Sequence, residues 1–189
     1  MLQGTVQVLL AFGPMRVLTP LVAEERYGPG AYGVLAACVP AGMILGSLVA
    51  LRLRPRRDGL AAMNAVAPMA AVMLCLGIDV PLVVYALVTV VAWAGISVFS
   101  VLWFSSLQRS YPARIQGRVF SVEQLATFAL DPIGLLLAPV VATAVGVPTV
   151  GVVAAVVLIA TTYAVLLVPG VTHFRDPDRE PVVEVPAAR

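Results

Sequence analysis

The chain alternates between long apolar runs and short polar segments. A helix that crosses a bilayer needs about 20 mostly apolar residues, whereas a membrane β-strand needs only about ten. Six runs have the length of membrane helices, and lipid favours segments whose backbone hydrogen bonds are all internal. We therefore predict an all-α membrane protein with six transmembrane helices. The predicted spans cover approximately residues 2–22, 32–51, 60–77, 82–107, 119–143 and 148–169.

The composition is that of an integral membrane protein. Of the 189 residues, 60% are hydrophobic and only 12% are charged, against about a quarter charged in soluble domains. We expect one transmembrane domain over residues 1–170, and a disordered cytoplasmic tail over the polar residues 171–189. The net charge of +2 is too small to suggest a nucleic-acid partner.

The arginines predict the orientation, because basic loops stay on the cytoplasmic side of a membrane. The segments after the second and fourth spans and the tail carry ten arginines, whereas the opposite loops carry only Arg26. We expect a multi-pass protein of the cell (inner) membrane with both termini in the cytoplasm. The ten arginines are Arg52, Arg54, Arg56, Arg57, Arg109, Arg114, Arg118, Arg175, Arg179 and Arg189.

Two polar side chains stand out in the first predicted span. Arg16 is six residues, or about 9 Å, from Val22, and could either extend to the outer interface or face a polar cavity. Gly13-Pro14 predicts a kink just before it. Gln7 shares a helix face with Gln3, and such glutamines either bond a neighbouring helix or line a path through the bilayer.

The fifth predicted span carries Asp131 near its middle. Gln124, Thr127 and Asp131 are spaced i, i+3 and i+7, so a continuous helix would present them on one face. An ionised carboxylate at this depth costs at least about 2.5 kcal/mol on insertion scales, and it requires a partner, a polar cavity or a proton. Either Asp131 belongs to a site in such a cavity, or it caps a helix that breaks at Pro132.

Small and aromatic residues mark two further helix faces. Gly42, Gly46 and Ala50 recur every four residues in the second span, which predicts close contact with another helix. Trp93, deep in the fourth span, either packs in a core or stacks on a substrate.

The polar stretch between the fourth and fifth spans has a recognisable pattern. Residues 108–124 read QRSYPARIQGRVFSVEQ. The spacing from Pro112 through Gly117-Arg118-Val119 to Ser121 resembles the loop between the tenth and eleventh helices of the major facilitator superfamily, most closely its drug- and macrolide-efflux branch. Because proline and glycine interrupt helices, we expect a cytoplasmic loop here, which either sets the topology only or moves during transport.

A second basic segment lies where the second half of that family carries a copy of a Gly-x-x-x-Asp-Arg-x-Gly-Arg-Arg signature. Gly46 and Arg54 match it, but Ala50 replaces the aspartate and Leu53 the second glycine. This copy therefore lacks the carboxylate on which a gating ion pair would be built. The resemblance implies that gating and topology involve residues of both basic segments: Arg54, Arg56, Arg57, Arg114, Gly117 and Arg118.

The resemblance also implies an architecture and an activity. It makes the chain the C-terminal six-helix half of a twelve-helix transporter, with spans one, two, four and five lining a substrate cavity and a second half supplied by another chain or another copy. The implied activity is proton-coupled efflux of a small hydrophobic or amphipathic compound by alternating access. The implied pathway residues are Gln7, Arg16, Gln124, Thr127 and Asp131.

Other function classes are less well supported. No phosphate-binding Gly-x-x-x-x-Gly-Lys-Ser/Thr segment is present, which excludes ATP-driven export by this chain. The single histidine, His173, lies in the tail, so we expect neither an intramembrane enzyme nor a cofactor or metal. The alternatives to a transporter are a non-transporting membrane scaffold or regulator and an inactive transporter fragment. The expected partners are the lipid bilayer, a small-molecule substrate and the second half.

Overall fold

The computed structural model describes residues 2–53, 58–110 and 113–164. These residues form helices joined by short turns and contain no β-strand, which confirms the predicted all-α class. The predicted tail and Arg54, Arg56 and Arg57 lie outside the described residues. The elements are α1 (Leu2–Gln7), the π-helical segment η1 (Val8–Phe12), α2 (Gly13–Tyr27), α3 (Ala31–Arg52), α4 (Asp58–Val66), α5 (Met69–Cys75), α6 (Leu82–Ser110), α7 (Ala113–Phe128), α8 (Asp131–Val145) and α9 (Val147–Ala164).

Length and hydropathy identify the helices that can cross a membrane. Four are long and apolar enough, namely Gln3–Tyr27, Ala31–Arg52, Leu82–Ser105 and Val147–Ala164. The first of these combines α1, η1 and α2, which follow one another directly. Two shorter apolar helical stretches, Ala61–Cys75 and Asp131–Val145, occur where the other two spans were expected.

The first helix is longer and less regular than expected. It continues to Tyr27, five residues beyond the predicted end. The π-helical segment η1 is closed by a bond from the Gly13 N–H to the Val8 carbonyl, directly before Pro14, which has no N–H to donate. π-helical turns are rare and often occur at functional sites.

Two of the expected spans are divided by turns. α4 and α5 are separated at Ala67-Pro68, where the proline removes a backbone donor. α7 and α8 are separated at Ala129-Leu130, so Asp131 is the first residue of α8 and Pro132 the second. The span predicted over residues 119–143 is thus not one continuous helix, and its break falls just before the Asp131-Pro132 position that one sequence interpretation named.

The expected loop around Gly117 and Arg118 is also wrong, because α7 begins at Ala113 and includes both residues. Proline is tolerated at the start of a helix, and one glycine inside a helix costs only about 1 kcal/mol relative to alanine. The Gln116 side chain donates to the Gln108 carbonyl at 2.8 Å and so ties the start of α7 to the end of α6. The rings of Phe104 and Phe120 lie 5.5 Å apart between the same two helices.

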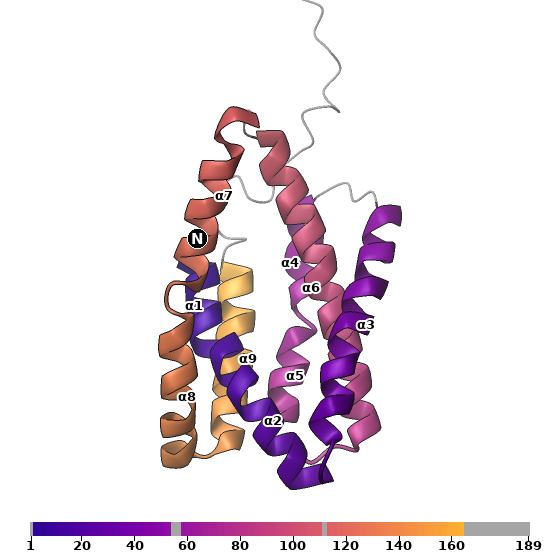
Figure 1. Ribbon diagram of the computed structural model, residues 1–189, viewed down its shortest axis with the longest axis vertical. Helices are drawn as coiled ribbons and strands as arrows, with labels where there is room; N and C mark the ends of the chain where they lie inside the picture. The colour runs from indigo at the N-terminus through magenta and orange to yellow at the C-terminus, as the bar shows by residue number, and fades with distance from the viewer. Residues whose placement is uncertain (1, 54–57, 111–112, 165–189) are drawn as a thin grey trace, which may run out of the picture.

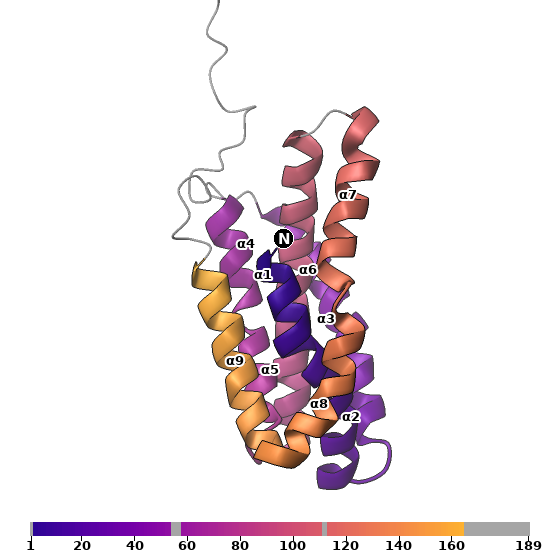
Figure 2. The same cartoon turned by 90° about the vertical axis from the view of Figure 1, so that its left-hand side faces the viewer.

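Figures 1 and 2 show an upright bundle with the α2–α3, α5–α6 and α8–α9 connections at one end and the adjoining ends of α6 and α7 at the other. Within it α3 packs on α6, α2 on α8 and α5 on α9. These three pairs approach closely at glycines, as is common between membrane helices. A Cβ atom on Gly42 would lie 2.5 Å from the Val90 carbonyl oxygen, and one on Gly151 would lie 2.5 Å from that of Met73. The predicted helix contact of Gly42 and Gly46 is confirmed, and its partner is α6.

Candidate functional site

Arg16 of α2 and Asp131 of α8 form an ion pair between the first and fifth predicted spans. Arg16 Nη1 lies 2.5 Å from Asp131 Oδ2. Arg16 is next to the middle residue of the 25-residue helix Gln3–Tyr27, so it is about 16 Å from the Tyr27 end. That distance exceeds the reach of an arginine side chain. The Arg16 side chain has a partner inside the bundle, and its reach to a membrane interface stays a prediction.

Two glycines bring this pair together. Gly13 precedes Arg16 by three residues, and Gly134 follows Asp131 by three. A Cβ atom on Gly13 would lie 3.1 Å from the Gly134 backbone, and one on Gly134 would lie 2.7 Å from the Leu9 carbonyl oxygen. The backbones of the first helix and α8 thus cross in direct contact, one helical turn from the charges. This crossing places the carboxylate within reach of the guanidinium.

The position of Asp131 agrees with neither the shared helix face nor the helix cap that the sequence suggested. The break before α8 separates it from Gln124 and Thr127, so the three residues do not share one continuous helical face. Gln124 is exposed on α7, and the Thr127 side chain lies outside the described part of the chain. Asp131 does not cap the break either, because Leu130 is the N-cap residue and Asp131 Oδ2 is used by Arg16.

The two charged groups are unequally exposed. The Arg16 side chain is 44% exposed, whereas that of Asp131 is 15% exposed. Asp131 Oδ1 is buried and makes no hydrogen bond to any described residue. The carboxylate is thus held on one oxygen only, and the guanidinium faces an open space.

That space is a cavity of about 450 Å³ between α2, α3, α5 and α6. Its volume is in the range of small-molecule sites. Most of its wall is apolar, with one charged group, Arg16, and hydroxyls from three elements. The lining residues are Met15, Arg16, Thr19, Tyr32, Leu35, Ala36, Val39, Val72, Thr89 and Trp93. Trp93 therefore both packs against Gly42 and borders the cavity.

Two buried hydroxyl groups face each other beside this cavity. Thr19 lines the cavity, and the fully buried Tyr85 of α6, which is not part of the wall, is hydrogen-bonded to the Thr19 side chain. Neither hydroxyl makes a hydrogen bond of ordinary geometry with any other described residue. The nearby Thr89 hydroxyl donates to the Tyr85 carbonyl at 2.8 Å. Because only Thr19 of this pair lines the cavity, its hydroxyl is the one that a polar group entering the cavity can reach.

Gln7 does not border this cavity. Its side-chain amide is buried and donates to the hydroxyls of Thr161 at 3.0 Å and Thr162 at 2.9 Å. These bonds join the first helix to α9. The structure thus places Gln7 in contact with a neighbouring helix, and its role in a pathway stays a prediction.

The basic residues of the two arginine-rich segments are not part of the site as described. Gly117 and Arg118 are exposed on α7, and a Cβ atom on Gly117 would meet no other atom within 4 Å. Arg114 lies in the first turn of α7, but its side chain is not described. Their part in gating or topology stays a prediction.

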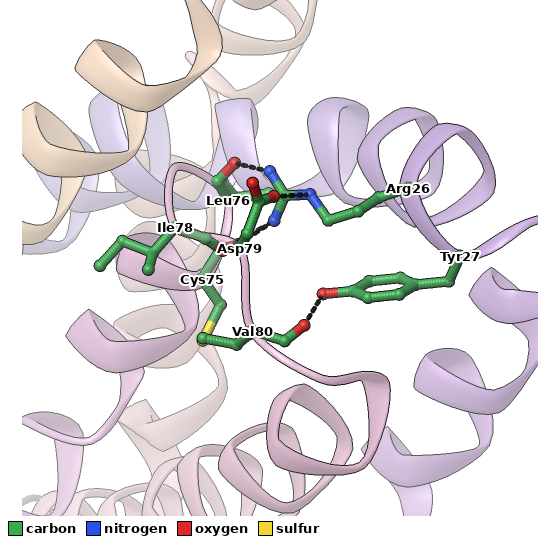
Figure 3. A network of polar contacts seen from close by, with 7 residues as sticks. All are labelled: Arg26, Tyr27, Cys75, Leu76, Ile78, Asp79 and Val80. Atoms are coloured by element: carbon green, nitrogen blue, oxygen red, sulfur yellow. Dashed lines mark hydrogen bonds and ion pairs between the residues drawn. The ribbon is translucent and has the colours of Figure 1, made fainter.

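A polar cluster around Arg26, which no sequence pattern predicted, holds the C-terminal end of α2 (Figure 3). Arg26 donates to the carbonyls of Cys75, Leu76 and Ile78 at 2.8–3.2 Å, and its Nε lies 2.9 Å from Asp79 Oδ1. The Tyr27 hydroxyl donates to the carbonyl of Val80. A cation at the C-terminal end of α5 complements the helix dipole and occupies carbonyls that the helix leaves free. This cluster fixes α2 to the α5–α6 connection.

Comparison with known families adds to this geometry. A family model described as transmembrane secretion effector matches residues 1–188. The chain belongs to this family. The family is a branch of the major facilitator superfamily, which confirms the resemblance at that level and places the chain among transporters, not enzymes. No curated protein and no solved structure matches the chain.

Proposed function

We propose that this member of the transmembrane secretion effector family is the C-terminal six-helix half of a secondary transporter in the inner membrane. It exports a small hydrophobic or amphipathic compound in exchange for protons by alternating access, together with a second six-helix half. The observation that carries the proposal is the Arg16–Asp131 ion pair, which lies near mid-span with Arg16 in the cavity wall.

Charged residues within membrane spans are costly and usually mark an ion or substrate path. Arg16 keeps its charge under all physiological conditions, whereas an aspartate can take up a proton. Among the described residues, Arg16 is the only charged group in contact with Asp131. Separation of the pair would therefore leave a carboxylate that is stabilised by protonation. In this mechanism Asp131 carries the proton and Arg16 controls when it is accessible.

Two irregularities in the backbone near the ion pair support a site whose helices move relative to each other. The π-helical segment η1 precedes Arg16 by one turn, and the α7–α8 break directly precedes Asp131. Transporters of this superfamily bind substrate near discontinuous helices at mid-membrane. In our proposal these two irregular points allow α2 and α8 to shift relative to each other while the helices themselves stay intact.

The test is transport by the purified chain in proteoliposomes with an imposed pH gradient. Uptake of fluorescent amphipathic dyes of either charge should be saturable and should collapse when the gradient is dissipated. Asp131→Asn should remove the dependence on the gradient. Asp79→Asn is the matched control, because it also neutralises the carboxylate of an ion pair but the Asp79 side chain is 90% exposed. Gradient-dependent flux that is unchanged in Asp131→Asn, at equal amounts of folded protein, would refute the proposal.

The second half has its own test. In our proposal the full transport path needs both halves, so single chains should transport weakly and activity should rise when two chains associate. Full, saturable efflux from strictly monomeric protein would contradict this. The absence of flux in any assembly would favour the scaffold or inactive-fragment interpretation.

The proposed orientation places both termini in the cytoplasm. A single cysteine at Val147 should react with a membrane-impermeant reagent added outside cells, and one at Ala187 should not, once Cys38 and Cys75 have been replaced. The opposite labelling pattern would show that the arginine count gives the wrong orientation.

A further inference from the structure

We infer that the cavity between α2, α3 and α6 is an anion site, whose ligand is an amphipathic organic carboxylate that competes with Asp131 for Arg16. This inference rests on the proposed function, because it names the substrate class of the same site. It goes beyond that function in assigning the ligand's charge and the group that recognises it.

The sign of the charge follows from which partner of the ion pair borders the cavity. Arg16 is part of the cavity wall, and Asp131 is not. The Arg16 side chain is 44% exposed and that of Asp131 15%. A ligand in the cavity therefore meets the cation first. A cationic ligand would have to approach Asp131 past a guanidinium that repels it.

Arg16 also has unused capacity to bind such a ligand. A guanidinium has five N–H donors in a planar fork that matches a carboxylate, and only Nη1 contacts Asp131 among the described residues. The remaining donors can hold a second carboxylate. Since two carboxylates on one guanidinium repel each other, an incoming anion weakens the hold on Asp131.

The rest of the wall fits the amphipathic part of the ligand. Leu35, Val39 and Trp93 provide an apolar and aromatic surface. The Thr19 hydroxyl, which is also part of the wall, offers a polar contact beside it. The site therefore favours a molecule with one carboxylate, an apolar body and room for one further polar group.

Trp93 provides a direct readout of binding. The chain has two tryptophans, so Trp103→Phe leaves Trp93 as the only one. The probe is 4-(4-nitrophenyl)butyrate, whose nitroaromatic ring quenches tryptophan on contact, and the matched neutral probe is its primary amide. Both are titrated into the full chain in nanodiscs of uncharged lipid. We expect the carboxylate to bind at least about tenfold more tightly than the amide, the size of one charge-assisted hydrogen bond.

Two variants separate recognition from structure. Asp131→Asn removes the competing carboxylate, so it should bind the anionic probe more tightly while leaving the amide unchanged. Arg16→Gln combined with Asp131→Asn leaves no unpaired charge and should bind both probes equally. A merely structural ion pair would produce neither result. Binding of the amide in each variant reports whether the cavity is intact. If Asp131→Asn does not fold, the double variant alone tests whether Arg16 recognises the carboxylate.

The inference is overturned if wild type binds carboxylate and amide equally, or if 4-nitrophenethylamine binds more tightly than the carboxylate. It is also overturned if the double variant keeps the carboxylate preference, or if folded Asp131→Asn binds the carboxylate no better than wild type does. These binding measurements do not require that the chain transports anything. If the chain shows gradient-dependent flux but no preference for the carboxylate, the proposed function holds and the anion site is refuted. If it binds the carboxylate but shows no flux in any assembly, the anion site holds and the proposed function is refuted.

Discussion

Removal of one charge of the Arg16–Asp131 pair should destabilise the protein more than removal of both. Asp131→Asn leaves a guanidinium near mid-span without a counter-ion, and an unpaired arginine there costs about 2.5–3.5 kcal/mol on insertion scales. Because Arg16 is 44% exposed to the cavity, water can solvate part of that charge. We therefore expect Asp131→Asn to lower the free energy of unfolding by about 1–3 kcal/mol.

The double variant Arg16→Gln/Asp131→Asn should recover most of that loss. Paired charges that are removed together leave no uncompensated group, and such replacements are often close to neutral. The assay is a double-mutant cycle on unfolding in nanodiscs, with Arg16→Gln as the fourth corner. A coupling energy of about 1–2 kcal/mol is expected. If the loss of stability in the double variant equals the sum of the losses in the two single variants, the coupling energy is zero and the assigned contact is wrong.

Three further predictions use the same unfolding assay. Gly134→Ala should cost about 1–3 kcal/mol and weaken transport, since its methyl group would collide with the backbone of η1, whereas Gly117→Ala, with open space around it, should be neutral or slightly stabilising. Arg26→Gln should lower the melting temperature clearly by freeing three carbonyls, whereas Asp79→Asn, 90% exposed, should change the free energy of unfolding by less than about 1 kcal/mol. Gln7→Leu should cost roughly 0.6–1 kcal/mol through its lost bonds to α9, and a stabilised variant would show that these bonds contribute nothing.

The sequence predicts the class of the protein and the importance of Asp131, but not its partner. Hydropathy identifies membrane helices because each lipid-exposed segment must be apolar by itself. The same reasoning marks a mid-span carboxylate as unusual. Arg16 and Asp131, however, are 115 residues apart, and they meet only because Gly13 and Gly134 let two backbones touch. No local pattern encodes that crossing.

The helical arrangement around residues 113–130 shows a second limit of sequence reasoning. Proline and glycine suggested a loop, yet Gly117 is accommodated inside α7 and the actual break falls at Ala129-Leu130. Turn propensities are small compared with the requirement that backbone groups near lipid be hydrogen-bonded. Packing against α6, through contacts such as Phe104 with Phe120, then decides where the helix begins.

The close glycine contacts have a consequence for how this protein can change its ligand. The residues that determine the spacing of the helices and those that shape the cavity are almost separate sets, and among the described residues only Trp93 belongs to both. Substitutions at Ala36 or Val39 can therefore alter the size and polarity of the cavity without altering the framework. Selection or directed evolution for new ligands should accumulate changes along that face of α3, while the glycines stay fixed.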